Sequence, residues 1–244
     1  MQRQRRLTPV RPAKGFTLVE LLMVVLIISI LVAILMPVIV NVIRGVGAVK
    51  TQARITSLAT GAVTFYKDNG FYPGQCDLPN TWGRGINQGF HNMKTRLESA
   101  DATTGLTGSQ VLARALFYNP DETSAPTSLK SNYAQYVPDE TCPTDPAISS
   151  RDYTIGDCWP KKQAMAICYY PARIGVAGMK MYKEEDNKVA YTEPNRATTD
   201  TFANAIKHPA IAGIPVKVGQ FILLAPGLDR QYFNADDVTN YAGQ

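Results

Sequence analysis

KGFTLVELLMVVLIISILVAILMPVIV, residues 14–40, is the stretch that decides the fold of this 244-residue chain. From Leu21 to Val40 every residue is apolar or small except Ser29. As a helix rising about 1.5 Å per residue, this segment reaches roughly 30 Å, the thickness of the hydrocarbon layer of a membrane. The sequence therefore predicts a transmembrane helix, with the carboxylate of Glu20 at its edge. A charge in such a place is costly and usually functional.

The net charge of +5 comes entirely from the first fifteen residues. Residues 16–244 carry 20 basic and 20 acidic side chains, because the 25 basic residues include five in the first fifteen: Arg3, Arg5, Arg6, Arg11 and Lys14. A basic flank before an apolar run is typical of the cytoplasmic end of a membrane segment. Nucleic acid is not an expected partner, since that would need a basic stripe on the folded domain. An uncleaved signal anchor is the simplest interpretation of the apolar run.

Residues 41–70 continue the apolar segment as an amphipathic helix. One face is formed by residues at three- and four-residue spacing, and the opposite face carries polar side chains. The apolar face is Ile55, Leu58, Ala59, Ala62, Val63 and Tyr66, and the polar side is Lys50, Thr51 and Arg54. Asn69-Gly70 ends the pattern. One helix over 16–66 would be roughly 75 Å long, and Pro37, Gly45 and Gly47 predict a bend or a readily unfolded stretch in its middle.

Residues 71–244 predict an α+β domain in which the long helix packs on an antiparallel sheet. Short apolar runs at 164–174 and 216–226 predict strands, and residues 179–192 predict a hairpin around Asp186-Asn187. Helices are expected at 107–118 and 198–208, the second with a Thr or Asp cap. Residues 75–150 are rich in turn-forming residues and indicate a loop insertion.

Cysteine and histidine usage favours a structural role over catalysis. The four cysteines follow the membrane segment, so an even number outside the cytoplasm permits two disulfides in any of three pairings. They are Cys76, Cys142, Cys158 and Cys168. No zinc spacing occurs among them, and the two histidines, His91 and His208, lie in no nucleophile or metal motif. We expect no enzymatic activity.

The heptapeptide from Lys14 to Glu20, followed at once by the apolar run, resembles the class III signal of type IV pilins and type II secretion pseudopilins. The resemblance implies that prepilin peptidase cuts between Gly15 and Phe16 and N-methylates Phe16. It implies a leader at 1–15, a transmembrane and filament-core helix at 16–40, an amphipathic half at 41–70 and a pilin-like globular domain at 71–244. Glu20 becomes the fifth residue of the mature chain.

Glu20 gains a physical role from this cut. The new amine of Phe16 is positive and lies one helical turn before Glu20, and opposite charges of neighbouring helices attract strongly in a low-dielectric medium. The resemblance implies that this pairing between subunits fixes their axial register. Pairing of Glu20 with its own amine, or extension of its side chain to the membrane interface, is the alternative.

Two further stretches are similar to pseudopilins. Residues 58–74 resemble the end of the long helix, and residues 219–241 resemble the C-terminal calcium loop of the major pseudopilin, here called the acidic loop over 225–241. Candidate calcium ligands are Asp229, Asn234, Asp236, Asp237 and Asn240. Their oxygens suit calcium, but an Asp/Asn-rich turn can also cap itself and bind nothing. Arg230 and Phe233 stand where the family often has glycine, which is costly if φ is positive.

The resemblance predicts a bacterial type II secretion pseudopilin that assembles into a helical filament. Expected partners are further copies, other pseudopilins, prepilin peptidase and the inner-membrane assembly platform. Its expected location is the inner membrane, crossed once, with the C-terminal domain periplasmic. A type IV or minor pilin, serving adhesion, motility or DNA uptake, is the first alternative, and a signal-anchored extracytoplasmic enzyme or binding protein is the second.

Overall fold

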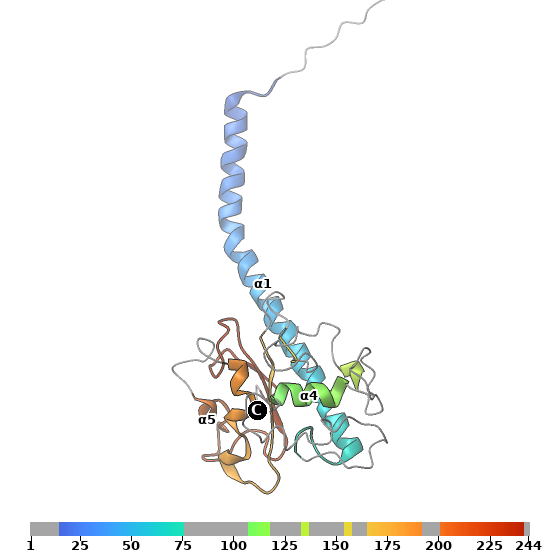
Figure 1. Cartoon of the computed structure of the whole chain (residues 1–244). Coiled ribbons are helices and arrows are strands. Elements are labelled where there is room, and N and C mark those ends of the chain that lie inside the picture. Colours follow the sequence, from blue (N-terminus) through green and yellow to red (C-terminus); the bar gives the residue numbers. More distant parts are fainter. Residues whose placement is uncertain are drawn as a thin grey trace, which may run out of the picture. The chain divides into compact units, whose positions relative to one another are not determined.

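A computed structural model describes residues 15–75, 107–117, 133–136, 154–157, 165–191 and 201–241. The chain divides into two compact units, Met1–Arg44 and Gly45–Gln244. Figure 1 labels the main helices, which are α1 (Leu18–Asn69), α4 (Gly108–Phe117) and α5 (Phe202–Ala205). The first unit contains only the start of α1 among its described elements. The second contains the rest of the fold.

Helix α1 has 52 residues and contains Pro37 without a break in the helix. Up to Arg44, the large apolar side chains of α1 whose burial is described are exposed, from 80% at Leu18 to 44% at Ile43. Among the described residues, α1 is the one helix long and apolar enough to cross a membrane. The predicted helix is confirmed, and the described side chains of its first half are exposed.

The second half of α1 buries one face in the domain, as its periodicity predicts. Ile55, Leu58 and Ala62 are fully buried. The predicted edges of this face are wrong, because Phe65 is buried whereas Tyr66 is 42% exposed. Arg54, expected on the polar side, is also buried. Its Nη1 donates to the carbonyl oxygens of Gly156 at 2.8 Å and Asp157 at 3.4 Å, and these acceptors lie about a hundred residues away.

Thr51 was likewise expected on the polar side of α1 and is buried. The buried face therefore extends one turn further toward the N-terminus than the apolar residues indicate. Lys50, the third residue expected there, is exposed. A polar side chain such as that of Arg54 tolerates burial where its donors meet carbonyl oxygens.

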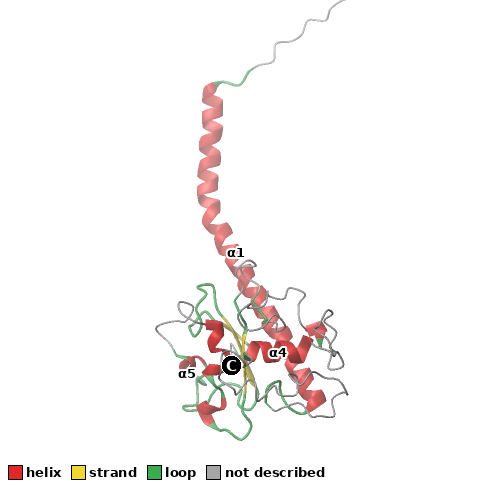
Figure 2. Cartoon of the chain, viewed as in Figure 1, coloured by secondary structure: helices red, strands yellow, loops and turns green. Residues whose placement is uncertain are grey.

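Three antiparallel strands form the sheet in the order β1-β2-β3 (Figure 2). They are β1 (Cys168–Pro171), β2 (Phe221–Ala225) and β3 (Val238–Thr239). Pro171 pairs with Phe221 at one end of the β1–β2 ladder, and Leu224 pairs with both Cys168 and Thr239 at the other. The two predicted strands are confirmed with shorter bounds, and the α+β class is confirmed with them.

Both faces of this sheet are covered, so its strands are apolar without alternation. Tyr169, Phe221 and Leu223 face a core shared with α1 and α4. Cys168, Tyr170 and Ile222 face a second core built from α5, the 3-10 segments and the C-terminal loop. The predicted packing of the long helix on a sheet therefore holds, with an additional layer behind the sheet.

The predicted hairpin at 179–192 is wrong. The chain instead forms two 3-10 helices, η3 (Gly178–Met181) and η4 (Glu184–Tyr191). Asn187 is fully buried, where its Oδ1 accepts from the Ser109 N–H at 3.1 Å and its Nδ2 donates to the Tyr169 carbonyl at 2.8 Å. Asp186 is also buried, against Arg173. A hairpin tip would place this Asp-Asn pair in solvent, so these inward contacts favour the 3-10 turns.

The two predicted short helices are present. Helix α4 packs so closely on β1 that a Cβ atom at Gly108 would overlap the Tyr169 carbonyl. Helix α5 begins after Thr201, whose side chain accepts from the Asn204 N–H at 3.3 Å, as the predicted threonine cap requires. A further 3-10 helix, η1 (Ala134–Tyr136), lies in the predicted insertion, and most of that insertion falls outside the described residues.

Candidate functional site

The predicted cleavage bond between Gly15 and Phe16 lies just before α1. Residues 15–17 are non-helical and exposed, and the helix begins at Leu18. A peptidase must bind backbone that is not already hydrogen-bonded within a helix. The bond between Gly15 and Phe16 is therefore accessible, because its backbone lies outside the helix. The residues before Gly15 lie outside the described residues.

Glu20 and Thr17 form a reciprocal cap at the first turn of α1. The Glu20 Oε2 accepts from the Thr17 N–H at 2.9 Å and from the Thr17 hydroxyl at 2.9 Å. The Glu20 N–H in turn donates to the Thr17 Oγ1 at 3.2 Å. This is a capping box, in which threonine at the N-cap and glutamate three residues later satisfy each other's backbone donors.

Thr17 is a site residue that our sequence interpretation missed. The pattern Thr-x-x-Glu before an apolar run is itself a signature of a helix N-terminus, so the signal was available. The cap also gives Glu20 partners within its own chain, in addition to the amine and the membrane interface considered from the sequence. Its carboxylate is therefore already hydrogen-bonded within the single chain.

The acidic loop brings three of its five candidate ligands together. Asn234 lies between the other two: its Nδ2 donates to Asp229 Oδ2 at 2.6 Å, and its Oδ1 accepts from the Asp236 N–H at 3.3 Å. Asp229 Oδ1 also accepts from the Gln231 N–H at 2.8 Å. The turn thus caps itself through side-chain to backbone bonds, as the alternative interpretation predicts.

Asp237 faces the inside of the same loop. Its Oδ2 accepts from the N–H groups of Phe233 at 2.7 Å and Asn234 at 3.3 Å. Its Oδ1 is buried without a hydrogen-bond partner among the described residues. Burial raises the pKa of Asp237 to about 7, the two N–H donors oppose this rise, and the charges of Asp236 and Asp229 add to it. A nearby cation would favour the charged form of this carboxyl group.

Asn240 is placed apart from the other candidate ligands. Its Oδ1 accepts from the Leu223 N–H at 3.0 Å, and its Nδ2 donates to the Phe221 carbonyl at 3.3 Å. Both groups of the carboxamide are thus used to extend the pairing between β2 and β3. The sequence interpretation grouped Asn240 with the calcium ligands of the acidic loop, but its side chain is hydrogen-bonded to the backbone of β2.

Arg230 and Phe233 adopt the left-handed backbone that makes glycine favourable at these positions, with φ of 64° and 69°. Phe233 is also fully buried, and its ring packs edge-on against Phe202 with centroids 5.6 Å apart. The buried ring compensates for the backbone cost, which explains how a phenylalanine can occupy this position.

The acidic loop fits calcium in its donor types but does not present a finished site. Within the described residues, no group of three or more acidic, histidine or cysteine side chains is arranged to hold a metal ion. Two observations favour a cation nonetheless: the unpartnered Oδ1 of Asp237, and the close approach of Asp236 to Gly227, where a Cβ atom would overlap its carboxylate. Asp229, Asp236 and Asp237 are the residues that would hold the ion.

Cys168 is a buried free thiol on β1, and burial raises its pKa. It forms no disulfide with any part of the chain that the structure describes. Cys76, Cys142 and Cys158 lie outside the described residues. The predicted pairing of the cysteines therefore stays a prediction.

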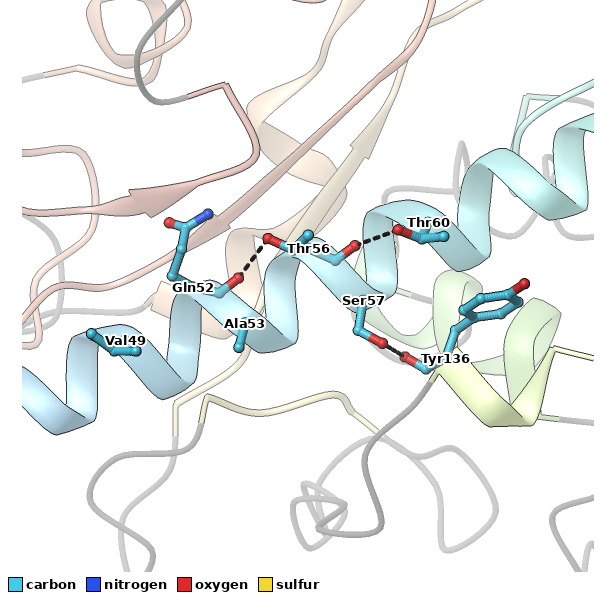
Figure 3. Close-up of a pocket in the computed structure, with 7 residues that line it drawn as sticks. All are labelled: Val49, Gln52, Ala53, Thr56, Ser57, Thr60 and Tyr136. Atoms are coloured by element: carbon cyan, nitrogen blue, oxygen red, sulfur yellow. Dashed lines mark hydrogen bonds between the residues drawn. The ribbon is translucent and has the colours of Figure 1, made fainter.

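A groove of about 570 Å³ lies along the second half of α1 (Figure 3). It is lined by Val49, Gln52, Ala53, Thr56, Ser57, Thr60 and Tyr136. The Thr56 hydroxyl donates to the Gln52 carbonyl and the Thr60 hydroxyl to the Thr56 carbonyl, both at 2.9 Å. These two hydroxyl groups therefore already have a hydrogen-bond acceptor in the helix backbone. Among the described residues, the lining of the groove contains no acid, histidine, cysteine or lysine.

Comparison with protein families matches residues 10–36 to the prokaryotic N-terminal methylation motif. This motif is characteristic of type IV pilins and pseudopilins, and the match confirms the predicted resemblance of the N-terminal segment. It includes Gly15, Phe16, Thr17 and Glu20. No curated protein and no solved structure matches the chain.

Proposed function

We propose that this chain, which carries the N-terminal methylation motif of the type IV pilin and pseudopilin family, is a structural filament subunit, most specifically a pseudopilin of a type II secretion system. The observation that supports it is the capped carboxylate of Glu20 beside an accessible Gly15–Phe16 bond, at the start of an exposed apolar helix. An apolar face with no core of its own needs a membrane or other copies of the helix.

In this proposal the precursor is anchored in the inner membrane by α1, with the globular domain in the periplasm. Prepilin peptidase removes residues 1–15 and methylates Phe16. The new ammonium group then lies one turn before Glu20, and a neighbouring subunit's ammonium competes with the Thr17 cap for the carboxylate. Assembly exchanges the bonds from two neutral Thr17 donors for a contact between opposite charges, and such a contact is strong in a low-dielectric medium. The assembly platform and other pseudopilins would act on this mature form.

The first test is the mass of the mature chain. Purified from membranes of a host with prepilin peptidase, it should lack residues 1–15 and carry one methyl group on Phe16. Gly15→Leu, which adds a bulky side chain at the bond, should retain the full leader and serves as the control. A wild-type mass that begins at Met1 would contradict the proposal and favour an uncleaved anchor.

We further propose that the acidic loop binds calcium, which favours the pseudopilin over a type IV pilin. Binding to the folded form alone would stabilise it by about 2.7 kcal/mol at a calcium concentration 100 times Kd. That corresponds to about 5–10 °C in Tm for a chain of this size. Calcium would neutralise the charges of Asp229, Asp236 and Asp237. The pKa of Asp237 is raised mainly by burial and further by the charges of Asp236 and Asp229, and a bound cation would oppose both effects.

The calcium test measures Tm of the full chain in detergent with and without a chelator. Wild type should lose about 5–10 °C on chelation, as argued above, and Asp236→Ala should lose that difference. Glu185→Ala, which removes an exposed acid outside the loop, should keep it. Equal Tm values for wild type in both buffers, with Asp236→Ala equally insensitive, would rule out the ion.

A further inference from the structure

Exposed aliphatic side chains gather at one end of the sheet. Beyond α1, the described residues expose six large aliphatic side chains, and five of them belong to two loops. These five, which we call the aliphatic end, are Ile174, Val176, Ile211, Ile214 and Val218, exposed by 37–69%. The sixth is Leu228, in the acidic loop. Single exposed aliphatics need no explanation, but a concentration of them indicates an interaction surface.

The two loops of the aliphatic end lie side by side. Gly178 lies against the Gly213 carbonyl, with 3.6 Å from an ideal Cβ position to the oxygen. The His208 N–H donates to the Ile214 carbonyl at 2.9 Å, and the Tyr182 hydroxyl donates to the Lys217 carbonyl. Tight turns normally use Gly, Asn, Asp, Ser or Pro at their tips. Branched aliphatics in such loops serve no turn chemistry, which favours a partner outside the domain.

The aliphatic end and the acidic loop lie at opposite ends of β2. The loop after β1 leaves beside the Pro171–Phe221 pair, and the segment up to residue 220 enters β2 at the same pair. The acidic loop leaves β2 after Ala225, beyond the Leu224–Thr239 pair. Green loops accordingly run out from both ends of the yellow strands in Figure 2. One rigid sheet therefore separates the two surfaces along the strand direction.

The two ends differ in charge as well. The segments that carry the aliphatic end, and the residues next to them in the chain, contain four lysines, Lys180, Lys183, Lys207 and Lys217, against the acids Glu184 and Glu185. The acidic loop exposes Asp229 and Asp236, and its one basic residue is Arg230, close in the chain to Leu228. Without a bound ion, the apolar surface with lysines nearby at one end is therefore complementary to the apolar side chain with acidic neighbours at the other. Such complementarity steers association and fixes its orientation.

We propose that the aliphatic end of one subunit receives the acidic loop of a second copy, with Leu228 inserted among Ile211, Ile214 and Val218. This contact rests on the proposed filament function and names the surface that joins its globular domains. Because the two patches differ and lie at opposite ends of the domain, the contact is heterologous. Repeating it gives an open chain of subunits where the rotation between copies does not close a ring, as the proposed filament requires.

Site-specific photo-crosslinking tests this contact in the full chain. A benzophenone amino acid at Ile211, in cells that process the leader, should yield crosslinked multimers in which residues 225–241 of a second copy carry the adduct. The same label at Gln52, an exposed residue of α1, should give no adduct in the acidic loop. Multimers that crosslink elsewhere, or adducts only to lipid, would overturn this contact and leave the filament proposal standing. Absence of any multimer of wild type would overturn both.

A charge exchange provides the second measurement. Ile211→Glu and Leu228→Lys each bury a charge without its partner, and each should lower multimer yield by at least about tenfold, equivalent to about 1.4 kcal/mol per contact. The double variant places glutamate against lysine across every contact and should recover most of the yield. Both positions are exposed in the single chain, so Tm of the detergent-solubilised variants should match wild type. Single variants that assemble normally, or a double variant no better than the singles, would overturn the contact.

Discussion

Glu20→Ala should insert into the membrane and be processed at Gly15, yet fail to assemble. The alanine variant keeps the basic leader, the Gly15–Phe16 bond and the whole apolar segment, which together determine insertion and cleavage. It loses the carboxylate that would pair with a neighbour's Phe16 ammonium. At an effective dielectric constant of about 20, two unit charges 4 Å apart attract by about 4 kcal/mol. Because the loss recurs at every subunit, we expect processed protein in the membrane and no sheared filaments by electron microscopy.

Two matched variants separate the charge of Glu20 from its cap. Glu20→Gln keeps an oxygen that can accept from Thr17 but removes the charge, so it should also be processed and fail to assemble. Thr17→Val removes the hydroxyl and keeps the charge, which costs the helix start about 1 kcal/mol and should leave filaments intact. Normal filaments from Glu20→Gln would show that Glu20 serves only as a helix cap.

The sequence predicts the parts of this fold that depend on local pattern. The apolar run fixes α1, the periodicity of Ile55, Leu58 and Ala62 fixes its buried face, and the apolar runs fix β1 and β2. These features depend on hydrophobic spacing within one segment, which a sequence displays directly. The N-terminal motif is predictable for the same reason, because the basic leader, the cleavage bond and Glu20 are neighbours in the chain.

What the sequence does not predict depends on partners distant in the chain. The buried Arg54 donates a hydrogen bond to the Gly156 carbonyl, and the side chain of Asn240 accepts one from the Leu223 N–H of β2. Asn187 forms no hairpin tip because Ser109 and Tyr169 bind its side chain. Each of these polar residues has a pattern typical of solvent exposure, and only the tertiary fold supplies its acceptors and donors. The same holds for the candidate calcium ligands. Asn234 bonds to its neighbours within the acidic loop, whereas Asn240 bonds to the backbone of β2.

Asp186→Ala should destabilise the globular domain by about 3–5 kcal/mol, the cost of breaking a buried ion pair from one side. Arg173 Nη2 lies 2.5 Å from Asp186 Oδ1 and Nη1 lies 2.7 Å from Oδ2, so the pair is bidentate. The two side chains are 9% and 1% exposed. Removal of the carboxylate leaves a buried guanidinium whose Nε already lacks a hydrogen-bond partner among the described residues. Chemical denaturation of the full chain in detergent measures the loss.

The double variant Arg173→Met with Asp186→Leu distinguishes loss of the pair from loss of packing. It removes both charges and keeps apolar volume, and such replacements of buried pairs are often neutral or stabilising. We therefore expect it to recover most of the stability that Asp186→Ala loses, although Asp186 precedes Asn187, which holds η4 against α4 and β1. Recovery would show that the pair matters because neither charge tolerates burial alone. A double variant as unstable as Asp186→Ala would show instead that the two hydrogen bonds between Arg173 and Asp186 hold η4 in place. In that case apolar packing could not replace these bonds.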